Sequence, residues 1–176
     1  MNTYPMFTPP EDLAVIGAKN WKKKEAQRYF DWLMSEKSTR VDYFLKYIGY
    51  VLTSNDEKDL KEISPLLYTS INNDSFYSIR EFDNAKQLND MGLAMACDMG
   101  LLLAQLLQES KPQLYWEIGK GPKTYHSYNL PVLKQFVNRE WDLLFTSISK
   151  NGYSLNELKQ PYDWFTFYND LKSKAL

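Results

Sequence analysis

The apolar stretch at 91–107, MGLAMACDMGLLLAQLL, restricts the fold of this chain more than any other segment. The helical pattern around it predicts one long helix at about 83–109, which at 1.5 Å per residue would span roughly 40 Å. After residue 90 the helix has almost no polar face, so it must be surrounded by protein. A membrane span needs about 20 apolar residues and disfavours a central carboxylate. Because Asp98 lies inside the stretch, the sequence predicts a buried central helix.

Shorter amphipathic patterns surround the central helix. They predict helices at 22–36, 40–52, after Ser54, at 131–149 and at about 162–171. The segments 22–36 and 40–52 could also form one bent helix, because periodicity does not separate the two arrangements. Pro65 lacks a backbone donor and is predicted to end or restart its helix.

A small β-hairpin is predicted at about 114–128. Residues 114–118 alternate between apolar and polar, residues 124–128 supply the second strand, and GKGP at 119–122 connects them. The predicted fold class is therefore mainly α, or α+β with minor β: a multi-helix bundle around one long buried central helix, plus one small hairpin. Three prolines near the N-terminus predict an extended arm at 1–20, either frayed or laid over the body, followed by a single helical domain at 21–176.

The composition excludes several functions. The chain has 176 residues, with 21 Lys and Arg against 22 Asp and Glu and a net charge of −1. Such a balance provides no field to attract nucleic acid or an anionic membrane. One cysteine, Cys97, and one histidine cannot form a disulfide or a Cys/His zinc framework. We therefore expect no metal, no cofactor, no nucleic-acid partner and no membrane partner. The N-terminus lacks a secretory pattern, which predicts a cytoplasmic protein.

Asp98 is the most unusual residue, because it lies in the most apolar part of the chain. A buried carboxylate must be paired, hydrogen-bonded or protonated. One interpretation is a structural ion pair with Arg28, Arg40 or Arg80, or hydrogen bonds to tyrosines or to the backbone of the predicted hairpin. The other is a site carboxylate with a raised pKa. The structural interpretation is favoured, because structural networks also perturb carboxylates.

The only histidine, His126, follows the predicted turn and could act as a general base near neutral pH. No acidic partner for it is evident in the sequence, so an exposed strand histidine is the favoured interpretation. If the chain were an enzyme or a small-molecule binder, its pocket would lie between the central helix and the hairpin and contain Asp98, His126 and Glu117. No signature of a recognisable enzyme class is present.

Aromatic residues make up 15% of the chain. Tyrosine is common at binding surfaces because it combines a large apolar ring with a polar tip. Five tyrosines without a clear core position are predicted to form such a surface: Tyr43, Tyr47, Tyr50, Tyr125 and Tyr128. This favours a non-catalytic module that binds another protein or a second copy of itself.

Several short motifs resemble those of small uncharacterised bacterial proteins of the Bacteroidetes and Firmicutes. They are YFDWL at 29–33, RVDYF at 40–44, DMG at 98–100, WEI at 116–118 and NLPVL at 129–133, with Phe136. The resemblance implies a bacterial, cytoplasmic protein with no assigned activity or catalytic residues. It agrees with a protein interaction module of the immunity or regulatory type.

Overall fold

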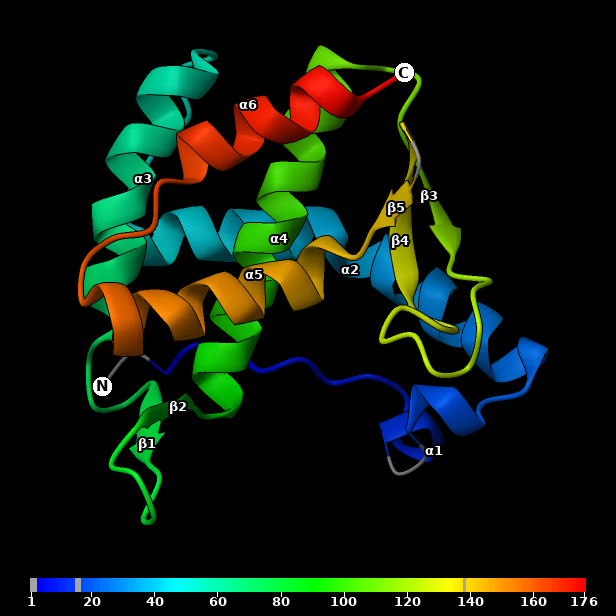
Figure 1. Cartoon of the computed structure of the whole chain (residues 1–176), viewed down its shortest axis with the longest axis horizontal. Coiled ribbons are helices and arrows are strands. Elements are labelled where there is room, and N and C mark those ends of the chain that lie inside the picture. Colours follow the sequence, from blue (N-terminus) through cyan, green and yellow to red (C-terminus); the bar gives the residue numbers. More distant parts are fainter. Residues whose placement is uncertain (1–2, 15–16, 138) are drawn as a thin grey trace.

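A helix in the middle of the molecule organises the fold (Figure 1). The computed structural model describes residues 3–14, 17–137 and 139–176. The central helix, α4 (Asp90–Ser110), packs most extensively against α5 (Leu143–Tyr153) and α2 (Lys23–Ile48). Two further helices, α6 (Trp164–Lys174) and α3 (Asp56–Ile71), complete its surroundings. The predicted class, mainly α with minor β around one buried helix, is confirmed.

Helix α4 behaves as a core helix. It is long and apolar enough to cross a membrane by length and composition alone, but 72% of its most apolar window is buried inside the protein. Gly100 allows the close approach of α5, since a Cβ there would lie 2.6 Å from the carbonyl oxygen of Leu143. The helix begins later than the predicted residue 83, because the side chain of Asn89 accepts hydrogen bonds from the amides of Met91 and Gly92.

The two predicted helices at 22–36 and 40–52 are one continuous helix, α2, the alternative that periodicity left open. It ends at Gly49, whose φ of +70° lies in the left-handed region that favours glycine. The prediction that Pro65 ends or restarts a helix was wrong, because Pro65 lies inside α3. That helix starts at Asn55, whose side chain accepts a hydrogen bond from the Lys58 amide.

The hairpin prediction at 114–128 was wrong in its second half. Strand β3 (Tyr115–Ile118) pairs with β4 (Pro131–Phe136), and β4 pairs with β5 (Arg139–Trp141), in an antiparallel order β3-β4-β5. The predicted helix at 131–149 is therefore two strands followed by α5. Strand β4 is central and mostly buried, so its apolar residues do not alternate and imitate a helical pattern.

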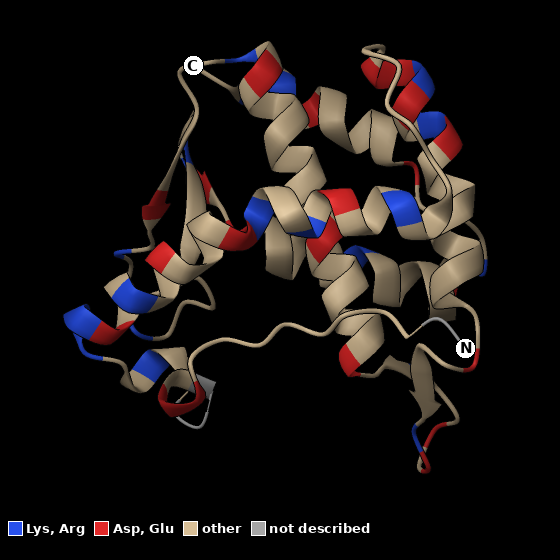
Figure 2. Ribbon diagram, turned by 180° about the vertical axis from the view of Figure 1, so that it is seen from behind, with Lys and Arg blue, Asp and Glu red and all other residues tan. Residues whose placement is uncertain are grey.

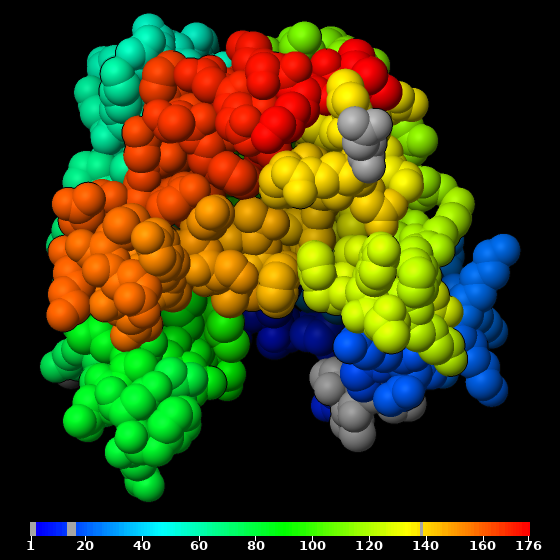
Figure 3. Space-filling view, in the orientation of Figure 1, coloured from blue at the N-terminus to red at the C-terminus, as the bar shows by residue number. Residues whose placement is uncertain are grey.

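A second hairpin, β1 (Tyr77–Ile79) with β2 (Lys86–Leu88), was not predicted and projects from the body (Figures 1 and 3). Asn156 fixes its base. The Asn156 Oδ1 accepts from the Lys86 amide at 2.8 Å, and its Nδ2 donates to the Lys86 carbonyl at 2.8 Å. A two-stranded sheet is only marginally stable alone, so this contact supports it.

The N-terminal segment lies against the body rather than apart from it. After an irregular start it forms two short helices, α1 (Glu11–Ala14) and η1 (Ala18–Asn20), and the Tyr4 side chain is only 2% exposed. Asn129 ties the segment to the β3–β4 loop, because its Nδ2 donates to the carbonyls of Ala18 and Trp21 at 2.9 and 3.0 Å. Charges of both signs are interspersed over the ribbon in Figure 2, in keeping with the near-neutral composition.

Candidate functional site

The buried carboxylate of Asp98 belongs to a structural network. Arg40 donates to it twice, from Nε to Oδ1 at 2.9 Å and from Nη2 to Oδ2 at 2.6 Å, and the Tyr4 hydroxyl also donates to Oδ2. The remaining Arg40 nitrogen donates to the carbonyls of Pro5 and Met6 at 2.7 and 3.2 Å. Both charges are therefore fully hydrogen-bonded, and the network joins the N-terminal segment, α2 and α4.

The partner of Asp98 is thus Arg40, one of the three arginines that the sequence left open. The other two form exposed pairs, Arg28 with Asp12 and Arg80 with Asp83. Burial raises the pKa of Asp98 to about 6, while Arg40 opposes that rise. Asp98 is 0% exposed and does not line any of five hollows in the described surface, so it is closed off from a ligand there.

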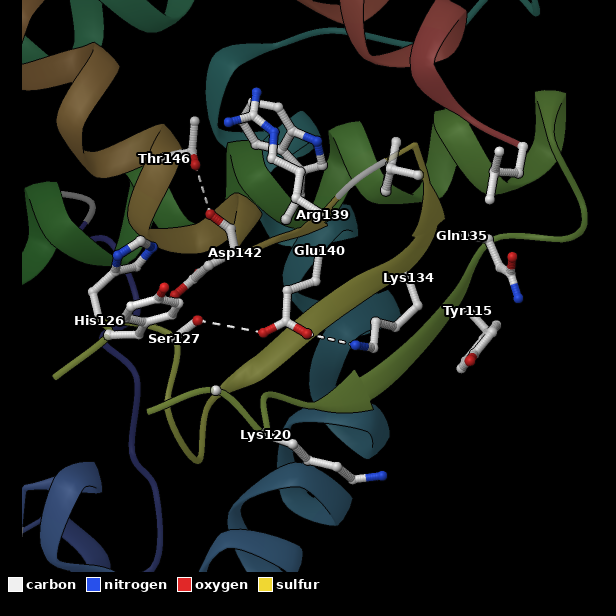
Figure 4. Close-up of a pocket in the computed structure, with 15 residues that line it drawn as sticks. Tyr115, Lys120, His126, Ser127, Lys134, Gln135, Arg139, Glu140, Asp142 and Thr146 are labelled. Atoms are coloured by element: carbon white, nitrogen blue, oxygen red, sulfur yellow. Dashed lines mark hydrogen bonds and ion pairs between the residues drawn. The ribbon is translucent and has the colours of Figure 1, made fainter. Parts of the chain in front are cut away.

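A cleft of about 800 Å³ lies where the β3–β4 loop, strands β4 and β5 and the start of α5 meet (Figure 4). The loop is closed at its neck: the Gly119 amide donates to the Leu130 carbonyl at 2.8 Å, and the Asn129 amide to the Gly119 carbonyl at 3.0 Å. A Cβ at Gly119 would lie 2.2 Å from the Ser127 carbonyl oxygen, so glycine permits this closure. The closed loop presents Tyr125 and His126 to the cleft.

The charged side chains along one side of the cleft neutralise one another. Lys134 pairs with Glu140 at 2.5 Å and approaches Glu117 at 3.9 Å, and this pairing raises the Lys134 pKa through the Glu140 hydrogen bond. Lys120 pairs with Glu117, and the Ser127 hydroxyl donates to Glu140 at 3.5 Å. Figure 4 shows Ser127, Glu140 and Lys134 in a row along the strands.

The other end of the cleft holds an unsatisfied carboxylate oxygen. Asp142 caps α5: its Oδ1 accepts from the Phe145 amide at 3.0 Å. Its Oδ2 is buried and has no hydrogen-bond partner in the part of the chain that the structure describes. Burial raises the Asp142 pKa, and the Phe145 amide, then the charge of His126 and then the Leu144 amide oppose that rise. The side chain extends toward His126 in Figure 4.

The cleft also carries an exposed cation and an aromatic rim. The Arg139 guanidinium lies 3.6 Å from the centre of the Trp141 ring and makes no ion pair among the described residues. His126 stacks on Phe145, with ring centroids 4.5 Å apart. Three aromatic residues of this region are strongly exposed: Tyr115 at 45%, Tyr125 at 57% and Phe145 at 46%.

The structure does not bring the three candidate residues of the sequence together. Asp98 is enclosed between α2 and α4, His126 lines the cleft, and Glu117 is occupied by Lys120 and Lys134 beside it. The cleft itself lies against α5 rather than between the central helix and a hairpin.

The five tyrosines predicted to form one surface lie in two places. Tyr43 is 49% exposed on α2 and lines a separate groove with the half-buried Tyr47. Tyr47 contacts the Tyr4 ring, and the Tyr50 hydroxyl donates to Asp59 at 3.0 Å, so both have internal partners. Tyr125 lines the cleft, and Tyr128 is half-buried in the same loop.

Sequence reasoning missed the residues that define the cleft, namely Arg139, Glu140 and Asp142. All three fell inside the predicted helix at 131–149. One signal could have found Asp142: an aspartate followed three residues later by Phe145 and then by a regular apolar period is typical of a helix N-cap.

No protein-family model, curated protein or solved structure matches this chain. Within residues 3–14, 17–137 and 139–176, no group of three or more His, Cys, Asp or Glu side chains could hold a metal ion.

Proposed function

We propose that this chain is a non-catalytic binding protein and that the cleft beside α5 is its recognition site for a segment of a partner protein. The observation that carries the proposal is the coincidence, in one hollow, of exposed aromatic rings, the unpaired Arg139 and the unsatisfied Asp142 oxygen. Aromatic residues and arginine are the types most enriched at the centres of protein interfaces.

The chemistry supports binding more than catalysis. His126 is exposed and makes no hydrogen bond among the described residues, and its one ring contact is with Phe145. A general base works when a second group orients it. Here no hydrogen bond from a carboxylate orients His126 among the described residues.

A cytoplasmic setting and a role of the immunity or regulatory type remain part of this proposal. The near-zero net charge favours recognition by shape and aromatic anchors over a broad electrostatic surface.

A second candidate is a small-molecule binder, favoured by the concave form of the site. A cleft of about 800 Å³ is in the range of pockets that hold drug-sized ligands. Aromatic walls with a few converging polar groups are also typical of such pockets.

One experiment tests both candidates. Isotope-labelled protein is titrated with a mixed library of small fragments and short peptides, and amide and indole shifts are followed by NMR. We expect the shifts to concentrate on Tyr125, His126 and Trp141. Ligands that bind elsewhere on the surface, or no binding at all, would overturn the proposal. If the tightest ligands are peptides, the site recognises a protein segment; if they are rigid fragments, it recognises a small molecule.

The chain offers a matched pair of controls for that experiment. Tyr125 and Tyr43 are exposed to a similar degree, 57% and 49%, but line different hollows. Tyr125→Ala should weaken the tightest hits about tenfold, as loss of an interface aromatic usually does. Tyr43→Ala should leave their affinity unchanged. The reverse result would move the binding surface to α2.

A further inference from the structure

Asp142 differs from the other acidic side chain that lines the cleft, and the difference points to a ligand. That side chain, Glu140, already holds Lys134 at 2.5 Å. Asp142 is 5% exposed, and its Oδ2 is the one carboxylate oxygen in the described chain that is buried with no hydrogen-bond partner. An unpartnered buried acceptor is costly, and a charged one more so.

The geometry points to a primary ammonium group as the ligand group that completes Asp142. This inference rests on the proposed function, because it names the chemistry that the same cleft recognises. A group placed here must donate a hydrogen bond, since Oδ2 only accepts when ionised. An ammonium donates and also compensates the charge, which makes the hydrogen bond roughly twice as strong as a neutral one.

The surroundings of Asp142 suit a cation. His126 stacks on Phe145 next to it, and aromatic faces attract an ammonium. Lys134 is held by the Glu140 carboxylate, and the Arg139 guanidinium lies over the Trp141 ring, so neither forms an ion pair with Asp142. His126 is exposed and held by this ring contact, so it can move aside to admit the group.

A primary ammonium on a partner protein comes from a free N-terminus or from a lysine side chain. Four amidated tetrapeptides separate these sources: Ala-Phe-Ala-Ala with a free N-terminus, its acetylated form, acetyl-Ala-Phe-Lys-Ala, and the same peptide with norleucine for lysine. The phenylalanine is common to all four and supplies the apolar contact with the aromatic rim.

The experiment is an NMR titration of each peptide at neutral pH. We expect at least one ammonium-bearing peptide to bind about tenfold more tightly than its matched peptide without the charge, a difference of about 1.4 kcal/mol. The peptide that shows the preference identifies the source. If neither ammonium-bearing peptide binds more tightly than its matched peptide without the charge, the inference is wrong.

Substitution of Asp142 then assigns the effect to this residue. Asp142→Asn retains an oxygen to cap α5 but removes the charge, since asparagine and aspartate are equally good N-caps. It should abolish the preference. The control is Asp163→Asn, which changes the equivalent cap of α6, where Oδ1 accepts from the Thr166 amide at 2.9 Å. Should Asp142→Asn fold poorly, Asp142→Ser provides a second capping variant without the charge.

The outcomes separate this inference from the proposed function. Peptides that bind in the cleft without preferring an ammonium, or that keep the preference in Asp142→Asn, overturn the inference and leave the binding site in place. Loss of all binding in the cleft, for peptides and fragments alike, overturns both.

Discussion

Two aspartates in this protein are buried almost equally but differ in their hydrogen-bond partners. Asp98 is 0% exposed and accepts two hydrogen bonds from Arg40 and one from Tyr4. Asp142 is 5% exposed, with one oxygen bonded to the Phe145 amide and the other to nothing among the described residues. Burial alone therefore does not distinguish a structural carboxylate from a candidate binding group; the completeness of its hydrogen bonds does.

The Asp98 network connects parts of the chain that are far apart in sequence. Tyr4 and Asp98 are separated by 94 positions, and Arg40 and Asp98 by 58. Arg40 also lies over the Phe7 ring, 4.3 Å from its centre. The Asp142 side chain makes no comparable long-range hydrogen bond among the described residues, because its Oδ1 accepts from the Phe145 amide of its own helix and its Oδ2 has no partner.

The largest expected effect is from breaking the buried pair. Asp98→Ala leaves the Arg40 guanidinium buried without its counter-ion, which should lower the free energy of unfolding by about 3–5 kcal/mol. Urea denaturation followed by circular dichroism measures this. The control is Asp83→Ala in the exposed pair with Arg80, where the loss should be much smaller because solvent screens the charges. Equal losses for the two variants would contradict the comparison.

The next effect concerns the N-terminal segment. Tyr4→Phe removes the hydroxyl that donates to Asp98 but preserves the ring, which contacts Tyr47 and Phe76. A hydrogen bond to a charged group contributes about 1.5–3 kcal/mol, and the unfolding free energy should fall by that amount. Hydrogen exchange at residues 3–10 should rise in the same variant. Unchanged exchange would show that the ring alone holds the segment.

The contrast between these regions also explains what could be predicted from sequence. The central helix and the pairing of Asp98 could be predicted, because a long apolar run must be buried and a carboxylate inside it must have a partner. Arg40 could not be chosen over Arg28 and Arg80, since that depends on how α2 crosses α4. The cleft was missed because Val132, Leu133 and Phe136 lie in a short buried strand, and such runs do not differ from helical ones in periodicity.

A smaller effect is expected at Asp142. In Asp142→Asn the α5 cap is retained and a buried, unpaired charge is removed, so the unfolding free energy at neutral pH should stay within about 1 kcal/mol of the wild type. Asp142→Ala loses the cap as well and should be destabilised by about 1 kcal/mol relative to Asp142→Asn. A loss of several kcal/mol in Asp142→Asn would mean that the carboxylate has a structural role like that of Asp98.

The smallest effect is a pH trend, and its sign follows from the raised Asp142 pKa. Burial makes the folded carboxyl hold its proton more tightly than the unfolded chain does. The native state therefore binds more protons between the ordinary aspartate pKa, about 3.9, and the raised value. Across that window, the unfolding free energy of the wild type should fall with rising pH relative to Asp142→Asn, which has no proton to lose there.

Denaturation series of both proteins from about pH 4 to pH 7 measure the difference. A difference that instead grows in favour of the wild type would mean that the Asp142 charge is stabilised in the fold, and that no ligand is needed to complete it.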